Sequence, residues 1–219
     1  EDFSVYPRQI EKDTNMLGET GLCDILFTPH RNELYADDFS VYVVPRNAED
    51  DGEGKSRPDF FEGVATIVTK LFNIVQPNAA YFGQKDAMQC VVVEKLVKDL
   101  NFPIKIKIVP IVREADGLAL SSRNAYLTET ERERATVIYK SLLEGKFFWQ
   151  NHFSKSKEPI TNERLSAVIK TKLLSEDLVS EIEYITIGSK STLARLDTID
   201  DSGGIVTVAV KIGSVRLID

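Results

Sequence analysis

Apolar side chains recur at steps of three and four residues between positions 61 and 75, which predicts a helix with one wide apolar face. Pro77 follows directly and cannot continue that helix. A short buried strand is then predicted at residues 79–82, and a second helix at residues 86–100. Over residues 104–112 isoleucine at first alternates with lysine, which is typical of a half-buried strand.

This order of strand, helix and strand predicts a βαβ unit, in which two parallel strands are joined by a right-handed crossover. Ligands of such sheets bind beyond the carboxyl ends of the strands. Two motifs begin at these ends: YFGQKD at residues 81–86 and READGLALSSRN at residues 113–124. We therefore expect the two motifs to form one site.

The pattern changes after residue 126. Thr128 and Glu131 have the spacing of a capping box, which predicts a helix that begins here and continues through Leu143. A further helix is predicted at residues 162–174.

Three later segments alternate apolar and polar positions, and a Gly203-Gly204 step suggests a tight connection between strands. Together they predict a small antiparallel sheet packed with helices. We expect two domains, residues 1–112 with the βαβ unit and residues 113–219 with an α+β fold. The alternating segments are residues 182–187, 205–210 and 215–218.

Local composition gives three further expectations. Residues 47–55, with the sequence NAEDDGEGK, are acidic and contain two glycines, so we predict a flexible surface loop. Gly117 is expected to provide a turn after Asp116. Arg113 and Glu114 are expected to form a structural ion pair.

The composition is that of an ordinary soluble protein, with 42% hydrophobic and 28% charged residues among 219. A net charge of −7 argues against non-specific nucleic-acid binding, which needs a basic surface, but allows a small anionic substrate. Cys90 lies in the apolar run of a predicted helix and far from Cys23, so we expect a buried free thiol and a cytoplasmic protein. No apolar run approaches the roughly 20 residues of a membrane span, and the first residues do not form a signal peptide.

The first motif has features of a phosphate site. Gly83 lets the backbone approach a ligand closely, and the next helix directs its free amide groups to the same place, where Lys85 would add its charge. Gln89 lies one helical turn beyond Lys85 and suits a substrate with hydroxyl and carboxylate groups. On spacing alone, Lys85 is a surface lysine, Asp86 an N-cap and Gln89 a solvated helix residue.

The second motif adds two hydroxyls and a guanidinium, from Ser121, Ser122 and Arg123, which can stabilise charge on a phosphoryl group. By itself, Ser-Ser-Arg-Asn would be an ordinary polar turn. Arg57, in KSRPDFFEGV, is a candidate substrate ligand, although a loop arginine commonly forms a surface salt bridge. The two histidines are unrelated in spacing and no Cys–His cluster occurs, so no metal held by protein ligands is expected.

Both motifs resemble those of the pantothenate synthetase (pantoate–β-alanine ligase) family of the nucleotidyl-transferase superfamily, and the resemblance covers nearly the whole chain. It implies an α/β fold, with a Rossmann-like nucleotidyl-transferase domain, incomplete at its N-terminus, followed by a small α+β domain. It also implies ATP-dependent ligation of pantoate and β-alanine through a pantoyl adenylate, with release of AMP and pyrophosphate. A homodimer is implied, with Mg²⁺ held mainly by the ATP phosphates.

The resemblance assigns roles to individual residues. Lys85, Ser121, Ser122 and Arg123 are implied to be catalytic. The residues implied to contact ATP are Gly83, Lys85, Asp86, Val112, Ser121, Ser122 and Arg123. The residues implied to contact pantoate are Gln89, Arg57 and Tyr6.

Two family strings are absent from the sequence, a His-x-Gly-His signature that contacts ATP and an Asn-Pro-x-Gln-Phe string whose glutamine contacts pantoate. On this comparison the chain opens within the family's first domain. We expect residues 1–219 on their own to fold and self-associate but to be inactive as a ligase. The alternative function is that of a non-catalytic relative, a nucleotide-binding or dimer-forming module with the same fold.

Overall fold

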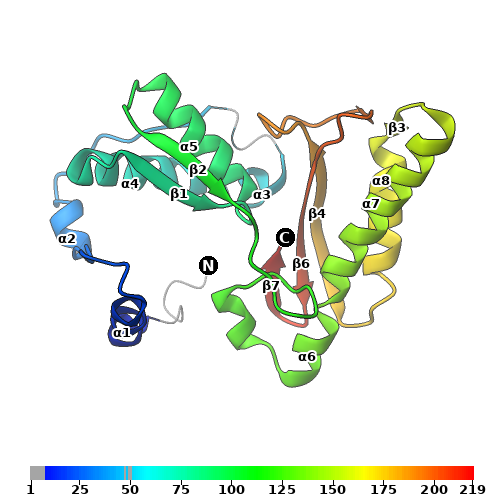
Figure 1. The fold of residues 1–219 in the computed structure, drawn as a ribbon, viewed down its shortest axis with the longest axis horizontal. Coiled ribbons are helices and arrows are strands. Elements are labelled where there is room, and N and C mark those ends of the chain that lie inside the picture. The colour runs from blue at the N-terminus through cyan, green and yellow to red at the C-terminus, as the bar shows by residue number, and fades with distance from the viewer. Residues whose placement is uncertain (1–7, 47, 49–50) are drawn as a thin grey trace. The chain divides into compact units, whose positions relative to one another are not determined.

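The computed structural model describes residues 8–46, 48 and 51–219. The chain forms two compact units, Glu1–Val41 and Tyr42–Asp219 (Figure 1). The first unit contains helix α1 (Ile10–Thr20) and the short helix α2 (Arg31–Leu34), and neither helix buries a residue. Tyr6 lies outside the described residues.

The second unit begins with the predicted βαβ arrangement. Helix α4 (Phe60–Val75) precedes strand β1 (Ala79–Gly83), and helix α5 (Ala87–Asp99) connects β1 to β2 (Lys105–Val109). The two strands pair in parallel, which confirms the predicted topology. Strand β1 is less buried than predicted, because the side chain of Tyr81 is 67% exposed.

One hydrophobic core lies between these elements. It joins α4, α5 and the residues around β2, and Cys90 of α5 is also buried, as a free thiol. Burial raises the pKa of Cys90 to about 11, so the thiol stays protonated. The buried members of the core are Ala48, Phe61, Ala65, Val68, Phe72, Val92, Val93, Leu96 and Ile104.

The predicted loop at residues 47–55 is wrong in its second half, because helix α3 (Gly52–Ser56) forms there. The Asp51 side chain accepts a hydrogen bond from the Gly52 amide at 2.8 Å and caps the helix. The prediction from composition failed here because the Glu53 side chain is largely shielded from solvent. Its side chain is 12% exposed and contacts strands that lie far ahead in the sequence.

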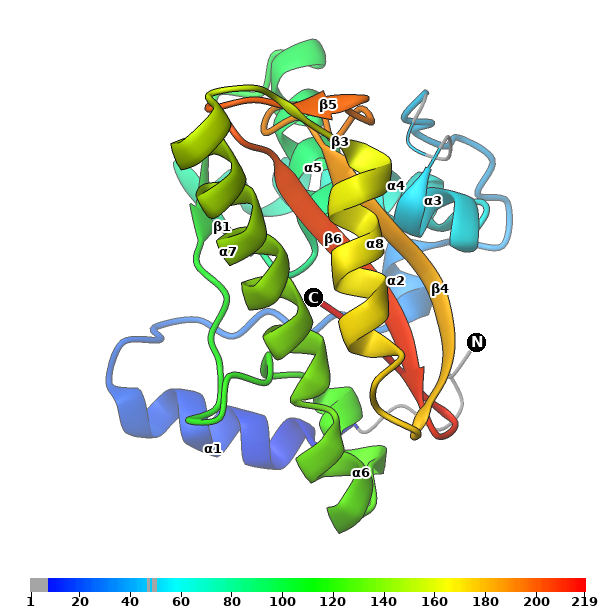
Figure 2. The same ribbon diagram turned by 90° about the vertical axis from the view of Figure 1, so that its right-hand side faces the viewer.

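The rest of the second unit is a three-stranded antiparallel sheet packed with helices. Its strands are β4 (Val179–Gly188), β6 (Ile205–Ile212) and β7 (Val215–Ile218), in the order β4-β6-β7. Helices α7 (Val137–Ser156) and α8 (Asn162–Leu173) cover one face of this sheet (Figure 2). These observations confirm the predicted antiparallel sheet and its helical packing.

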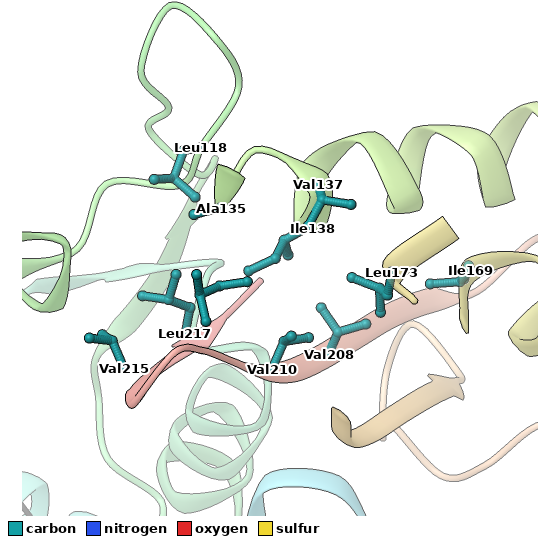
Figure 3. Close-up of a cluster of buried hydrophobic side chains, with 11 residues drawn as sticks. Leu118, Ala135, Val137, Ile138, Ile169, Leu173, Val208, Val210, Val215 and Leu217 are labelled. Carbon is teal, nitrogen blue, oxygen red and sulfur yellow. The ribbon is translucent and has the colours of Figure 1, made fainter. Parts of the chain in front are cut away.

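A second hydrophobic core lies between that sheet and its helices. Figure 3 shows Ile138 of α7 and Leu173 of α8 beside Val208 and Val210 of β6. Leu118 belongs to the same core, although it comes from the READGLALSSRN motif. The predicted domain boundary at residues 112 and 113 lies between the two cores and stays a prediction.

Two connections differ from the predictions. The Thr128–Glu131 capping box is confirmed, but helix α6 (Glu129–Arg134) ends before Leu143. The Thr136 hydroxyl donates to the Glu133 carbonyl at 2.9 Å and competes with the helical hydrogen bonds. Gly203 does form a turn, with φ +70°, but this turn joins β6 to the short strand β5 (Thr198–Ile199). Strand β5 pairs with β3 (Ile160–Thr161) in a separate sheet.

The READGLAL segment folds into a tight hairpin. The Leu120 amide donates to the Val112 carbonyl and the Gly117 amide to the Glu114 carbonyl, each at 2.9 Å. Gly117 makes the predicted turn with φ +96°, and a Cβ at this position would lie 2.0 Å from Cδ1 of Tyr139. Only glycine satisfies both the backbone conformation and the close approach of the tyrosine ring.

We predict that Gly117→Ala lowers the free energy of unfolding by about 2–4 kcal/mol, because it combines backbone strain with a clash against Tyr139. Gly63→Ala is the matched control. Gly63 lies within α4 and has open space around it, so alanine there should be neutral or slightly stabilising. Denaturant unfolding of both variants checks this, and equal stabilities would contradict the account of the hairpin.

Candidate active site

Lys85 lies in the turn between β1 and α5. The Gln84 amide donates to the Val109 carbonyl of β2 at 2.9 Å, and the Asp86 amide donates to the Gly83 carbonyl at 3.3 Å. Helix α5 starts only at Ala87, so Lys85 precedes the helix and does not share a helical face with Gln89. The turn nevertheless places Lys85 at the carboxyl end of β1, as the βαβ topology requires.

Ser121, Ser122 and Arg123 lie at the start of a short 3-10 helix, η1 (Ser122–Tyr126). The Ser121 hydroxyl caps this helix by accepting a hydrogen bond from the Arg123 amide at 3.2 Å. Asn124 secures the same segment, because its side-chain nitrogen donates to the Ala119 carbonyl at 3.1 Å. The three predicted phosphate ligands are therefore held by local hydrogen bonds directly after the hairpin.

The two motifs meet at a small hollow of about 10 Å³, which is lined by Lys85, Ser121, Asn124 and Asp219. This is room for about one water molecule, so the hollow marks where Lys85 faces the loop rather than the volume of a nucleotide. The Asn124 side-chain oxygen is buried and has no hydrogen-bond partner among the described residues. The expectation that both motifs form one site is thus supported by the geometry.

Lys85 is half-buried among charges of both signs. Burial lowers the pKa of Lys85, and the nearby Arg123 charge lowers it further, whereas Asp86, Asp219 and Glu53 oppose this shift. In the described part of the chain Lys85 forms no ion pair. A half-buried ammonium beside a second cation gains most from a ligand that carries several negative charges.

Asp219 is turned toward a different cation. Its two carboxylate oxygens accept hydrogen bonds from Arg113 at 2.5 and 2.7 Å, and its side chain is 3% exposed. The predicted pair between Arg113 and Glu114 is therefore wrong. Arg113 also lies over the Tyr139 ring, with Cζ 4.4 Å from the centroid.

A second group of charges joins α3 to the sheet. Arg216 of β7 donates to Glu53 at 2.7 and 3.2 Å and to Glu183 of β4 at 2.8 Å. The Tyr184 hydroxyl donates to Glu53 at 2.9 Å, and the Ser56 hydroxyl donates to Glu183 at 3.1 Å. We call Glu53, Arg216, Glu183 and Tyr184 the Arg216 network.

The Arg216 network keeps its charges in the folded state. Burial alone would raise the pKa of Glu53, but the hydrogen bonds and charge of Arg216 and the Tyr184 hydroxyl lower it overall. Burial likewise opposes the charge of Arg216, yet its two carboxylate partners raise the pKa of the guanidinium. Glu53 and Arg216 are therefore both ionised at neutral pH.

Comparison with known proteins shows the family of this chain. The family model described as pantoate-beta-alanine ligase matches residues 1–219. This chain belongs to the pantoate–β-alanine ligase family. Its relatives include the pantothenate synthetase of Herpetosiphon aurantiacus, which is 42% identical over 219 residues, with 100% of this chain and 76% of the relative covered. The pantothenate synthetase of Carboxydothermus hydrogenoformans is 45% identical and is covered over 75% of its length.

Solved structures of this family share the fold. Pantothenate synthetase from Thermus thermophilus matches with a TM-score of 0.89 at 38% identity, over 100% of this chain and 76% of that one. Pantoate-β-alanine ligase from Francisella tularensis, solved as a complex with "Beta-gamma ATP and Beta-alanine", matches with a TM-score of 0.73 at 33% identity, over 100% of this chain and 71% of that one. The predicted nucleotidyl-transferase-type α/β fold is confirmed, and the non-catalytic alternative is not favoured.

The other predicted ligase residues lie at various distances from the hollow. Gly83 has open space where a side chain would be, and Asp86 occupies the N-cap position of α5 without a side-chain cap. Gln89 is half-buried in the first turn of that helix, whereas Val112 is 65% exposed. Arg57 contacts Glu53 at 3.5 Å and lies over the Phe60 ring.

Sequence reasoning missed the carboxylates Glu53, Glu183 and Asp219 and the cation Arg216. The one available signal was the charged Arg216 in the otherwise apolar strand sequence of β7. Across residues 8–46, 48 and 51–219, no group of three His, Cys, Asp or Glu side chains could hold a metal ion. None of the described helices is long and apolar enough to cross a membrane.

We predict that Glu53→Gln lowers the free energy of unfolding by about 3 kcal/mol at pH 7, because it leaves the buried Arg216 with one carboxylate. The folded-state pKa of Glu53 is depressed, so its contribution is complete above the ordinary value of about 4.5 and is lost as the pH falls through the folded value. The difference between wild type and variant should therefore shrink in acid.

Glu181→Gln is the matched control, because Glu181 on β4 also pairs with a cation, Lys211, but its side chain is 53% exposed. This control should cost less than about 1 kcal/mol. Chemical denaturation between pH 3 and 7 measures both variants. Equal losses in the two variants, or a Glu53→Gln deficit that grows in acid, would contradict the role of the Arg216 network.

Proposed function

We propose that this protein joins pantoate to β-alanine with cleavage of ATP to AMP and pyrophosphate. Membership of the pantoate–β-alanine ligase family supports the overall reaction. The observation that carries the proposal for the site is the position of Lys85, which lines one hollow with Ser121 and experiences the charge of Arg123.

The reaction takes place in two displacements. In the first, a carboxylate oxygen of pantoate attacks the α-phosphorus of ATP, the bond to the α,β-bridging oxygen breaks, and pyrophosphate leaves with the electron pair. In the second, the amine of β-alanine attacks the acyl carbon of pantoyl adenylate, loses a proton, and displaces AMP. The adenylate is needed because a free carboxylate is a poor acyl donor, whereas AMP is a good leaving group.

Lys85 and the loop from Ser121 to Arg123 act on the first displacement. Negative charge moves onto the departing pyrophosphate, and in this proposal Lys85 and Arg123 stabilise it, which their mutual proximity supports. Ser121 and Ser122 supply hydroxyl donors to the phosphoryl oxygens. In this proposal the protein works by positioning and charge stabilisation, and no covalent intermediate with the enzyme is required.

The remaining residues are proposed to bind the substrates. Gly83, Asp86 and Val112 border ATP, and Gln89 contacts pantoate. Tyr6 and Arg57 complete the proposed pantoate site.

Several properties of the whole enzyme remain proposals. Both Asp219 oxygens are engaged by Arg113, so the hollow offers few oxygen ligands, and Mg²⁺ bound with ATP would be held by phosphates and water. Such an ion would offset part of the phosphate charge. We further propose a homodimer, a boundary between the two domains at residue 112, and a cytoplasmic location, which the free cysteines support.

We predict that the full-length protein converts ATP to AMP and pyrophosphate only when pantoate is present, and forms pantothenate when β-alanine is added. Chromatography of the nucleotide products checks this. ADP and inorganic phosphate as products would indicate an acyl phosphate and exclude the adenylate route.

We predict that Lys85→Ala in the full-length protein raises the barrier to adenylation by about 2–4 kcal/mol, the effect of removing one preorganised electrostatic donor. Lys95→Ala is the matched control, since Lys95 lies on α5 but is exposed and pairs with Asp99. Pyrophosphate release in a single turnover measures both variants. Normal adenylation by Lys85→Ala would show that Lys85 is an ordinary surface lysine.

A further inference from the structure

We propose that Asp219 is a positioning residue of the ligase, which holds the hairpin of residues 113–120 so that Ser121 and Arg123 face Lys85. The inference rests on the proposed function and extends it to a residue that is assigned no contact with ATP or pantoate. It is carried by three features: a rigid support for Asp219, its bidentate contact with Arg113, and its place in the hollow beside Lys85.

The support is the antiparallel sheet. The Asp219 amide donates to the Val208 carbonyl at 3.1 Å, and the Val208 amide donates to the Asp219 carbonyl at 2.9 Å. Val208 is completely buried, and Leu217 on β7 is 4% exposed in the same core. The packed sheet thus fixes the backbone of Asp219 and, with it, the point from which the side chain extends.

The contact with Arg113 holds the hairpin in a fixed place relative to the sheet. Arg113 binds Asp219 through two nitrogens, donates to the Gly117 carbonyl at 3.0 Å, and lies over the Tyr139 ring. A bidentate arginine–carboxylate pair fixes direction as well as distance. The guanidinium therefore connects the sheet, the turn of the hairpin and α7.

The pair with Arg113 also keeps Asp219 from forming an ion pair with Lys85. Asp219 and Lys85 line one hollow, and their charges attract. Because Arg113 engages both carboxylate oxygens, Lys85 has no ion pair within the described residues and can bind a phosphate. A buried carboxylate whose two oxygens both face Arg113 can hold the loop in place while Lys85 stays available to the substrate.

The chain provides a matched control in Asp116. Asp116 also binds an arginine through two nitrogens, at 2.8 and 3.2 Å from Arg132, and it also restrains the hairpin. It does not line the hollow, and its side chain is 44% exposed. A general loss of hairpin rigidity would affect both variants, whereas loss of alignment with Lys85 would affect Asp219 alone.

The test compares Asp219→Asn and Asp116→Asn in the full-length protein. We expect kcat for adenylation to fall about tenfold to a hundredfold in Asp219→Asn, because a displacement on the order of 1 Å suffices for such a loss. The KM for ATP should change little, because Asp219 is assigned no contact with ATP. Asp116→Asn should retain wild-type kcat at temperatures well below its unfolding transition.

Amide hydrogen exchange over residues 113–123 provides a readout that does not depend on activity, and we expect faster exchange near Ser121 in Asp219→Asn. If Asp219→Asn does not fold, Asp219→Glu replaces it. That variant keeps the charge but moves it by one methylene, and kcat should again fall. Unchanged kcat in the folded Asp219 variant, or an equal loss in Asp116→Asn, would overturn the proposal.

Failure of the ligase function can be distinguished from failure of this inference. A wild-type protein that releases no pyrophosphate would contradict the proposed function. The exchange comparison would still decide the role of Asp219, because equal exchange over residues 113–123 in wild type and the Asp219 variant contradicts positioning.

Discussion

A buried arginine must have anionic partners, and in this protein that requirement fixes how distant parts of the second unit are joined. Arg216 is 6% exposed, and its guanidinium lies between Glu53 of α3 and Glu183 of β4. Removing one partner of such a group leaves an uncompensated charge in a region of low dielectric, so α3 is held on the sheet. Both ribbon views show α3 beside β4 (Figures 1 and 2).

The pairing of Arg216 with Glu53 and Glu183 explains how two separate hydrophobic cores contribute to one site. Lys85 follows β1 and belongs to the core around α4 and α5, whereas Ser121 follows a hairpin whose Leu118 belongs to the core around β6. Two contacts start from strand β7 and its end. Arg216 on β7 binds α3, and Asp219, which directly follows β7, binds Arg113. The distance between Lys85 and the phosphate loop thus depends on two ion-paired groups, one on strand β7 and one directly after it.

The sequence was most informative where structure depends on nearby residues. The apolar periodicity of α4, the alternation in β2 and the Thr128 capping box can each be recognised within a short stretch of sequence, and each was predicted. The meeting of Lys85 with Ser121 was also foreseen, because parallel strands bring their carboxyl ends to one edge.

The sequence was least informative where a partner is remote. Glu53 and Arg216 are 163 residues apart, and Arg113 and Asp219 are 106 apart, so no local pattern links them. For this reason α3 was predicted as a solvated loop and Arg113 was assigned to its neighbour Glu114. Both errors have one physical cause. A charged side chain is predicted to lie on the surface unless its buried counter-ion is known.

The central claim is that Lys85 and the segment from Ser121 to Arg123 together bind the phosphates of ATP. The most direct test is a crystal structure of the full-length protein with an ATP analogue that cannot be cleaved between the α- and β-phosphates. The account predicts phosphate oxygens within hydrogen-bonding distance of the Lys85 ammonium and of the Ser121 or Ser122 hydroxyl. A nucleotide whose phosphates lie away from Lys85, with the hollow beside Asp219 unchanged, would contradict it.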